Sequence, residues 1–316
     1  MHFQGSYVAL VTPFHEDGSV NFDKLKELCE WHAQNGTDGV VVLGTTGESS
    51  TMTHVEDEQV VQCAIDTLHG RIPVIAGSGS NCTETALMKS RAYKEAGADA
   101  LLLITPYYNK TNERGMYRHF ATVAEQVNLP IIIYNVPGRT GCSISVECMA
   151  ALSKLKNIAA VKEASGNISY VAKIAKYVND DFALLSGNDD MILPILSMGG
   201  SGVISVLANV CPRQTHDMVV SFLEGDRAKA LDLQLKLLDL INALFIEVNP
   251  IPVKEAMNML GMEVGGYRLP LEEMSDEHKA VLREKIRREQ LMAEHLDTVV
   301  ELIDALPAEQ IGRAHV

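Results

Sequence analysis

Short apolar runs recur along the first two thirds of the chain, and the stretches between them carry apolar residues at helical spacing. Runs of only four or five apolar residues are typical of strands that are buried on both faces of a parallel sheet. Eight such strands are predicted, over Tyr7–Val11, Gly39–Leu43, Pro73–Ala76, Ala100–Ile104, Pro130–Tyr134, Ile158–Lys162, Phe182–Leu185 and Gly202–Val206.

The predicted helices alternate with these strands. One covers Phe22–Asn35, and another covers Glu84–Ala96 with Thr83 as its N-cap. The interval from strand to strand is about 30 residues, the length of a βαβ unit. Eight consecutive units favour an α/β fold of the (β/α)8 barrel type. A doubly wound open sheet is the alternative, although the GxGxxG motif usual after its early strand is absent.

The strand pattern stops after about residue 218. We therefore predict a (β/α)8 barrel with the catalytic site over residues 1–218 and an appended C-terminal helical region over residues 219–316. The second part holds two helical stripes and one or two further charged helices within 277–306. We expect it to pack on the barrel and to form contacts between subunits. The stripes comprise Phe222, Leu231, Leu235, Leu238 and Ile241, and then Val253, Met257 and Leu260.

Composition narrows the class of protein. The 316 residues are 47% hydrophobic and 22% charged, which is ordinary for a globular protein. The net charge of −14 argues against binding to nucleic acid or to an anionic membrane. Six cysteines without a CxxC pattern, and no signal or membrane-spanning run, predict reduced thiols and a cytoplasmic location. The histidines lack ligand spacing, so neither a metal nor another cofactor is expected.

Lys162 stands at the end of an apolar strand, just before a Ser-Gly-Asn turn. Lysine is rarely buried without a partner, because removing an ammonium group from water is costly. In one interpretation Lys162 pairs with Glu163 or reaches water. In the other, a desolvated Lys162 with a lowered pKa attacks a carbonyl group and forms a Schiff base.

Other strand ends carry polar side chains that bear on this choice, because the carboxyl ends of barrel strands build the active site. Gly44-Thr45-Thr46-Gly47-Glu48-Ser49 ends the second strand and could hold a carboxylate or begin a helix. Tyr134 ends the fifth strand, and Arg139 follows in a Pro-Gly loop, as a carboxylate ligand or a surface side chain. Residues 77–81 are more typical of a plain loop than of a phosphate site. The convergence of these groups favours the catalytic interpretation of Lys162.

Three of these motifs resemble one known family. They are Gly44-Thr45-Thr46-Gly47-Glu48-Ser49, Val161-Lys162-Glu163-Ala164 and Tyr134-Asn135-Val136-Pro137-Gly138-Arg139-Thr140-Gly141. They are similar to those of the dihydrodipicolinate synthases, which belong to the pyruvate-dependent class I aldolases and lyases. The resemblance runs from about Tyr7 to about Leu269. The motif with Arg139 is more specific to the synthases than to the sialic-acid lyases or sugar-acid aldolases.

The resemblance implies catalytic roles for four residues. Lys162 would form a Schiff base with pyruvate. Tyr134 would donate and accept protons, linked to Thr45 and to Tyr108, and the tyrosine at the position of Tyr108 reaches in from a neighbouring subunit in the family. The family is usually a homotetramer, a dimer of dimers, and needs no cofactor. Tyrosine has an unperturbed pKa near 10, so hydrogen bonding would have to help it act as a base.

The resemblance also implies substrate contacts. Thr46 and the backbone at Ile204 would hold the carboxylate of pyruvate, and Gly187 would line the pocket near the Schiff base. Arg139 would receive the carboxylate of L-aspartate 4-semialdehyde. The product would be 4-hydroxy-tetrahydrodipicolinate, formed in the first committed step of lysine and diaminopimelate biosynthesis.

Many members of the family are inhibited by lysine in a cleft between two subunits. Five of the matching positions suit an amino-acid effector, and two depart from the sensitive pattern. Asp57 replaces a histidine, and Thr85 replaces a glutamate whose carboxylate would hold the ε-ammonium of the effector. The sequence therefore predicts weak or absent inhibition by L-lysine. The five compatible positions are Ser49, Ser50, His54, Asn81 and Tyr107.

Two other functions remain open at this point. The chain could be another pyruvate-dependent aldolase, of the N-acetylneuraminate lyase or 2-keto-3-deoxy sugar acid type, which Arg139 and Tyr108 disfavour. It could also be a non-catalytic relative, which the presence of Lys162, Tyr134 and Thr45 disfavours. Pyruvate consumption with each aldehyde or sugar-acid substrate separates the three.

Overall fold

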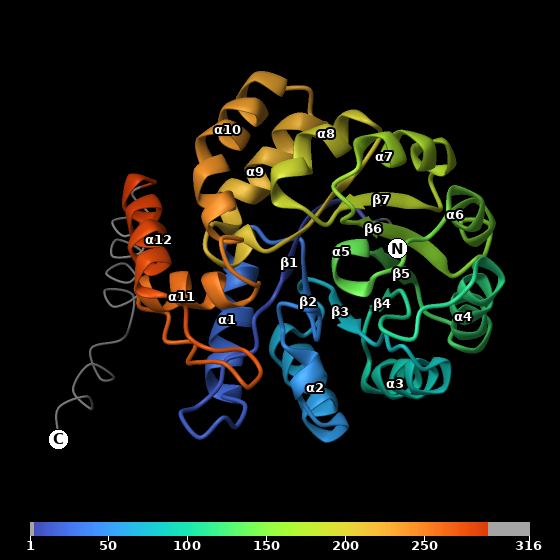
Figure 1. Ribbon diagram of the computed structural model, residues 1–316, viewed down its shortest axis with the longest axis horizontal. Helices are drawn as coiled ribbons and strands as arrows, with labels where there is room; N and C mark the ends of the chain where they lie inside the picture. The colour runs from blue at the N-terminus through green and yellow to red at the C-terminus, as the bar shows by residue number, and fades with distance from the viewer. Residues whose placement is uncertain (1–2, 290–316) are drawn as a thin grey trace.

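A computed structural model describes residues 3–289 of the chain, and in it eight parallel strands form a closed barrel. Each strand pairs with its neighbours in sequence, and the first pairs with the eighth (Figure 1). The strands are β1 Gly5–Ala9, β2 Gly39–Val42, β3 Val74–Gly77, β4 Ala100–Ile104, β5 Ile131–Asn135, β6 Ile158–Glu163, β7 Ala183–Ser186 and β8 Gly202–Ser205.

Helices follow each strand and surround the barrel. Figure 1 shows α10, α11 and α12 on the side of the barrel away from α4 and α6. The α-helices are α1 Phe22–Gln34, α2 His54–Leu68, α3 Thr83–Ala96, α4 Glu113–Gln126, α5 Pro137–Thr140, α6 Val146–Leu152, α7 Ile168–Ile174, α8 Ile192–Ser197, α9 Pro212–Leu223, α10 Arg227–Ala243, α11 Ile251–Met259 and α12 Asp276–Arg288. Short 3-10 helices are η1 Ser49–Thr51, η2 Ala175–Tyr177, η3 Asp189–Met191 and η4 Leu207–Asn209.

The alternation of side chains along each strand divides the core into two layers. One face of the strands fills the barrel interior, with Val41, Ile75, Leu102 and Ile132 among its residues. The other face packs against the surrounding helices, which is why the strands are apolar on both faces. Because the interior is packed with side chains, a site can open only at an end of the barrel.

The predicted barrel is confirmed, and the ends of most strands differ by one or two residues from the predicted ones. Leu10 and Val11, predicted to end the first strand, are buried but lie beyond β1. Their apolar side chains are explained by packing rather than by strand pairing. The N-cap prediction for Thr83 is wrong: Cys82 precedes α3, and the Thr83 hydroxyl lies 2.9 Å from Nδ1 of His119.

The described region after the barrel is helical, as the apolar stripes predict, but Leu231 and Leu235 of the first stripe are exposed, and α10 packs through Leu237, Leu240 and Ile241. α10 packs on α9, and α12 packs on α10 and α11. The division of the chain at residue 218 stays a prediction, and that residue lies within α9, which also contacts β1. The predicted charged helix begins at Asp276 and is described to Arg288; its continuation towards residue 306 lies outside the described residues.

No helix within residues 3–289 combines the length and the apolar character needed to cross a membrane.

Candidate active site

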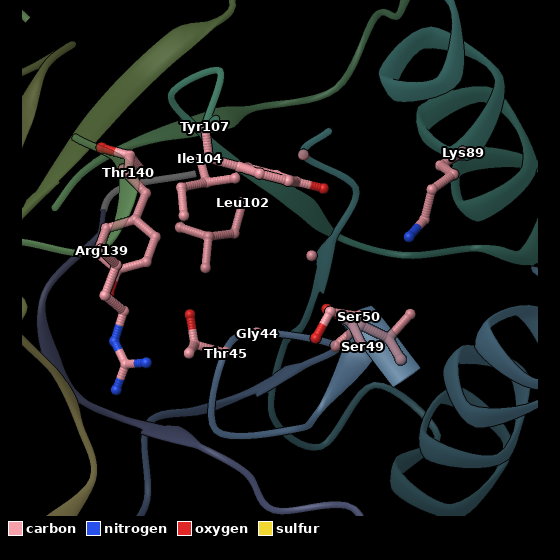
Figure 2. A pocket seen from close by; sticks show the side chains of 14 residues that line it. Gly44, Thr45, Ser49, Ser50, Lys89, Leu102, Ile104, Tyr107, Arg139 and Thr140 are labelled. Carbon is pink, nitrogen blue, oxygen red and sulfur yellow. The ribbon is translucent and has the colours of Figure 1, made fainter. Parts of the chain in front are cut away.

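A cavity of about 280 Å³ opens at the carboxyl end of the barrel. Thr45 and Arg139 line one side of it, and Ser49, Ser50 and Lys89 line the opposite side (Figure 2). Tyr134 is among its other lining residues. The carboxyl ends of β2, β3, β4 and β5 all contribute to this lining, as expected for a barrel enzyme.

Lys162 lies beside this cavity in a nearly closed environment. Its side chain is 6% exposed, and its Nζ lies 4.4 Å from the ring centroid of Tyr134, the residue paired with it across β5 and β6. Burial lowers the pKa of Lys162 to about 8; the charge of Asp189 raises it and that of Arg139 lowers it. An amine with this pKa is unprotonated in roughly a tenth of molecules at pH 7.

The alternative in which Lys162 pairs with Glu163 is wrong. Among the described residues Lys162 makes no ion pair, and the Glu163 carboxylate lies elsewhere. Oε2 of Glu163 accepts a hydrogen bond from Asn135 Nδ2 at 2.8 Å, and Oε1 accepts one from the Ser165 amide at 2.6 Å. Because successive strand residues point to opposite faces, Glu163 faces away from the barrel interior that holds Lys162.

Tyr134 is buried with Thr45 next to it. Burial raises the pKa of Tyr134, while the charge of Arg139 and a hydrogen bond with Thr45 lower it and the charge of Glu163 raises it. The net direction of the pKa is upward, because burial outweighs the hydrogen bond with Thr45 and the charge of Arg139. Tyr134 is therefore protonated at neutral pH and is first a proton donor.

Arg139 and Thr46 are joined by a residue that the sequence analysis missed. Nη2 of Arg139 donates to the carbonyl oxygen of Asn249 at 3.1 Å, and Nδ2 of Asn249 donates to Oγ1 of Thr46 at 2.9 Å. Since Thr46 accepts this bond, its own hydroxyl proton is free for another acceptor. Asn249 lies in the predicted C-terminal region, just before α11, and nothing in its local sequence links it to either partner.

The turn of residues 44–49 has a second contact with the C-terminal region, through Glu48. Its carboxylate pairs with Lys254 at 2.8 Å, and the two side chains are 1% and 0% exposed. Lys254 also donates to the carbonyl oxygen of Thr12 at 3.0 Å. The turn does begin the short helix η1 at Ser49, but neither threonine caps it, because Glu48 precedes it without a side-chain cap, and Thr53 caps α2 with Glu56 in a capping box.

Gly187 lies close to the lysine and Ile204 lies inside the barrel, and their predicted contacts with pyruvate stay predictions. A Cβ atom added to Gly187 would lie 2.7 Å from Ala164 Cβ and 3.1 Å from Lys162 Cε, so only glycine lets this strand end approach the lysine so closely. Ile204 belongs to the barrel interior, in β8, and neither residue lines the main cavity.

Tyr108 is not brought to Tyr134 within one chain. Its side chain is 90% exposed, and its φ of 68° is left-handed, which is uncommon for a residue other than glycine. Such a conformation persists only where its surroundings favour it and often marks a functional position.

Only three of the five predicted effector positions line the cavity. Ser49, Ser50 and Tyr107 line the outer part of the cavity. His54 lies 3.9 Å from the buried Asp57, whose carboxylate already pairs with Lys89 at 2.8 Å. The carbonyl oxygen of Asn81 accepts from Asn109 Nδ2 at 2.9 Å. Lys89, which the sequence analysis did not consider, supplies a cation of the chain itself at this end of the cavity.

The fold and the site define a TIM-barrel protein with a buried amine at the carboxyl end of its barrel. The chain belongs to the dihydrodipicolinate synthetase family, whose model matches residues 2–289. This confirms the resemblance that the sequence motifs carry.

Known proteins agree over nearly the whole chain. A 4-hydroxy-tetrahydrodipicolinate synthase of Lachnoclostridium phytofermentans is 52% identical, and the match covers 90% of this chain and 98% of that protein. The dihydrodipicolinate synthase structure from Aquifex aeolicus has a TM-score of 0.89 at 48% identity, over 92% of this chain and 99% of that one. A structure from Cyanidioschyzon merolae with lysine bound has a TM-score of 0.90 at 38% identity, over 92% and 100%.

Proposed function

We propose that this protein condenses pyruvate with L-aspartate 4-semialdehyde to give 4-hydroxy-tetrahydrodipicolinate, with Lys162 as the residue that binds pyruvate covalently. The observation that carries the proposal is Lys162 itself, which is buried and has a pKa of about 8 beside Tyr134. Family membership supports the substrates and the place of the reaction in lysine biosynthesis. The cytoplasmic location stays a prediction from the sequence.

The first half of the reaction forms an electron sink. The unprotonated Nζ of Lys162 forms a bond to the carbonyl carbon of pyruvate, and the carbonyl oxygen leaves as water. Tyr134, protonated at neutral pH, supplies a proton to that oxygen. Protonation of the imine nitrogen then allows a proton to leave the methyl group, which gives an enamine.

The second half forms the ring and frees the enzyme. The enamine carbon forms a bond to the aldehyde carbon of the semialdehyde, and the aldehyde oxygen takes up a proton to become a hydroxyl group. The amine of the same substrate then adds to the former imine carbon and displaces Lys162 as a free amine. One water is released for each product, and no oxidant or reductant is consumed.

Carboxylate recognition is divided between two groups in this proposal. Thr46, whose hydroxyl proton is free to donate, and the backbone at Ile204 hold the carboxylate of pyruvate. Arg139 receives the carboxylate of the semialdehyde, and Asn249 orients both Arg139 and Thr46. The proton relay runs from Tyr134 through Thr45 to Tyr108 of a neighbouring subunit, in a homotetramer.

Borohydride trapping tests the covalent step. Pyruvate with borohydride is expected to leave a stable adduct on Lys162, and the rate of trapping is expected to rise with pH up to about 8, because the attacking amine must be unprotonated. Peptide mass spectrometry locates the adduct. An adduct on another lysine, or none at all, would sink the proposal, and Lys156→Ala, on the loop before β6, is the matched control.

Arg139→Ala is expected to raise KM for the semialdehyde by roughly ten- to a hundredfold while changing KM for pyruvate much less. A hydrogen-bonded contact between charged groups contributes about 1.5–3 kcal/mol, and the variant removes it from one substrate only. Steady-state kinetics with each substrate varied in turn measures the split. Equal effects on both substrates would mean that Arg139 only supports Asn249.

L-Lysine is expected to inhibit weakly or not at all. Thr85 cannot supply the carboxylate that would hold the ammonium group of the effector. In addition, Lys89 already pairs with the buried Asp57 at this place. A second ammonium group would therefore meet a cation where it needs an anion. Titration of L-lysine into the assay measures this, and half-inhibition well below millimolar concentration would contradict it.

A further inference from the structure

Asp189 is a buried carboxylate at the start of η3, three residues beyond the end of β7, that the proposed reaction does not use. Its side chain is 2% exposed. Oδ2 accepts hydrogen bonds from the amides of Val206 and Leu207, at 3.0 and 2.9 Å, just beyond the end of β8. Oδ1 is also buried and has no hydrogen-bond partner among the described residues. A carboxylate in this state calls for a compensating charge.

The strand end that carries Asp189 packs against Lys162. The Gly187 amide donates to the carbonyl oxygen of Glu163 at 2.7 Å, and the Cβ position of Gly187 lies 3.1 Å from Lys162 Cε. Asp189 follows two residues later. Neither Lys162 nor Asp189 makes an ion pair within 4 Å in residues 3–289, so each is a buried ionisable group without an oppositely charged contact.

The charges around Lys162 come from three strand ends. Arg139, after β5, lowers the pKa of Lys162, and Asp189, after β7, raises it. Burial raises the pKa of Asp189, and the hydrogen bonds from residues 205–207 and the charge of Lys162 oppose that rise. Tyr134 presents its neutral ring, and Glu163 on β6 is turned away towards Asn135. Asp189 is thus the anion whose field reaches the lysine nitrogen.

We propose that Asp189 is the counter-ion of the protonated Schiff base on Lys162, acting through space rather than by contact. This rests on the proposed function. A direct ion pair would hold the ammonium form and occupy the nitrogen that must attack pyruvate. A more distant carboxylate leaves the nitrogen free, and it stabilises the positive imine once that has formed. The two backbone amides fix the carboxylate in place and favour its ionised form against the effect of burial.

The imine charge has a chemical consequence. Only the protonated imine withdraws electrons strongly enough for a proton to leave the methyl group of pyruvate. Asp189 therefore promotes enamine formation, although it touches neither substrate. It also keeps a larger fraction of free Lys162 protonated, which slows the first attack. Its removal is expected to speed one step and to slow the next.

Asp189→Asn separates these effects, because asparagine keeps an oxygen for the two amides and loses only the charge. The pH midpoint for trapping the pyruvate adduct on Lys162 is expected to fall by about one pH unit. Exchange of the pyruvate methyl protons in deuterium oxide, at saturating pyruvate, is expected to slow about tenfold. Asp190→Asn is the matched control: Asp190 is the exposed neighbour, and both readouts should stay at the parent values.

A counter-ion predicts that its removal makes the attack on pyruvate possible at lower pH but slows proton exchange, whereas the loss of a structural residue does not predict this combination. A slower exchange with an unmoved trapping midpoint would overturn the proposal and leave Asp189 as a support for residues 206 and 207. An unchanged exchange rate would overturn it as well. If the parent protein forms no adduct on Lys162, the proposed function itself fails, and this inference fails with it.

A second variant keeps the test decisive if Asp189→Asn does not fold. The Ser205 hydroxyl accepts from the Ala208 amide at 2.9 Å, and it lowers the pKa of Asp189. Ser205→Ala therefore weakens the ionised form, and both readouts are expected to move in the same directions by a smaller amount. Circular dichroism verifies the fold of each variant, and no movement in a folded Ser205→Ala protein would count against the counter-ion.

Discussion

Tyr108→Phe is expected to lose roughly a hundredfold or more in turnover, the usual contribution of a positioned proton donor or acceptor, while still forming the pyruvate adduct. The substitution removes only the phenolic oxygen. In one chain that oxygen is in solvent, since the side chain is 90% exposed. Its effect on turnover would therefore come from a neighbouring subunit. Coupled kinetics and adduct mass measure the two parts separately.

Subunit mixing sharpens this prediction. Tyr108→Phe protein, with its low turnover, and Lys162→Ala protein, which has none, are expected to recover part of the activity when their subunits exchange, because a mixed pair holds one complete site. Tyr117→Phe, on α4 and outside the cavity, is the control for loss of a phenol. Full activity of Tyr108→Phe, or no recovery despite proven exchange, would remove Tyr108 from the relay.

Lys254→Ala is expected to lower the free energy of unfolding by about 3–5 kcal/mol, because it leaves the buried carboxylate of Glu48 without its partner. The pair is 0% and 1% exposed, and Lys254 also lies 4.3 Å from the ring centroid of Phe14. Turnover of the remaining folded protein should also fall, because the turn with Thr45 and Thr46 loses an attachment. Urea unfolding measures the first effect, and activity per folded molecule measures the second.

Two comparisons test the reason for this loss. Lys279→Ala removes a lysine whose partner Glu273 is largely exposed, and it should cost less than about 1 kcal/mol. The double variant Glu48→Gln, Lys254→Met should be less damaged than Lys254→Met alone, because no unpaired charge then remains buried. A loss below 1 kcal/mol for Lys254→Ala would show that the pair is not needed for stability.

The barrel was predictable because each of its strands and helices has a recognisable pattern within its own short segment of the sequence. Each strand is a short apolar run, and each intervening helix has its own periodic face, so chain order alone gives the order of strands around the barrel. The candidate residues Thr45, Tyr134, Arg139 and Lys162 each stand at or just beyond the end of such a run. Since parallel strands end on one side of a closed barrel, their proximity follows from the fold class.

The support of the site was not predictable in this way. Asn249 meets Thr46 from 203 residues away, and Lys254 meets Glu48 from 206 residues away. Both residues lie in a region whose apolar stripes indicated packing and subunit contacts only. Lys254 stands in an amphipathic helix, where a lysine usually reaches solvent, so its burial could not be inferred from its neighbours.

The sequence by itself determined the eight strands, their order and the polar groups at their carboxyl ends, because hydrophobic periodicity and chain order are local properties. The tertiary structure alone decided the electrostatic state of those groups. Burial lowers the pKa of Lys162 and raises that of Tyr134, the charge of Asp189 raises the pKa of Lys162, and Glu48 pairs with Lys254 out of reach of water. A side chain's charge depends on the water and charges around it, and these come from parts of the chain that only folding brings together.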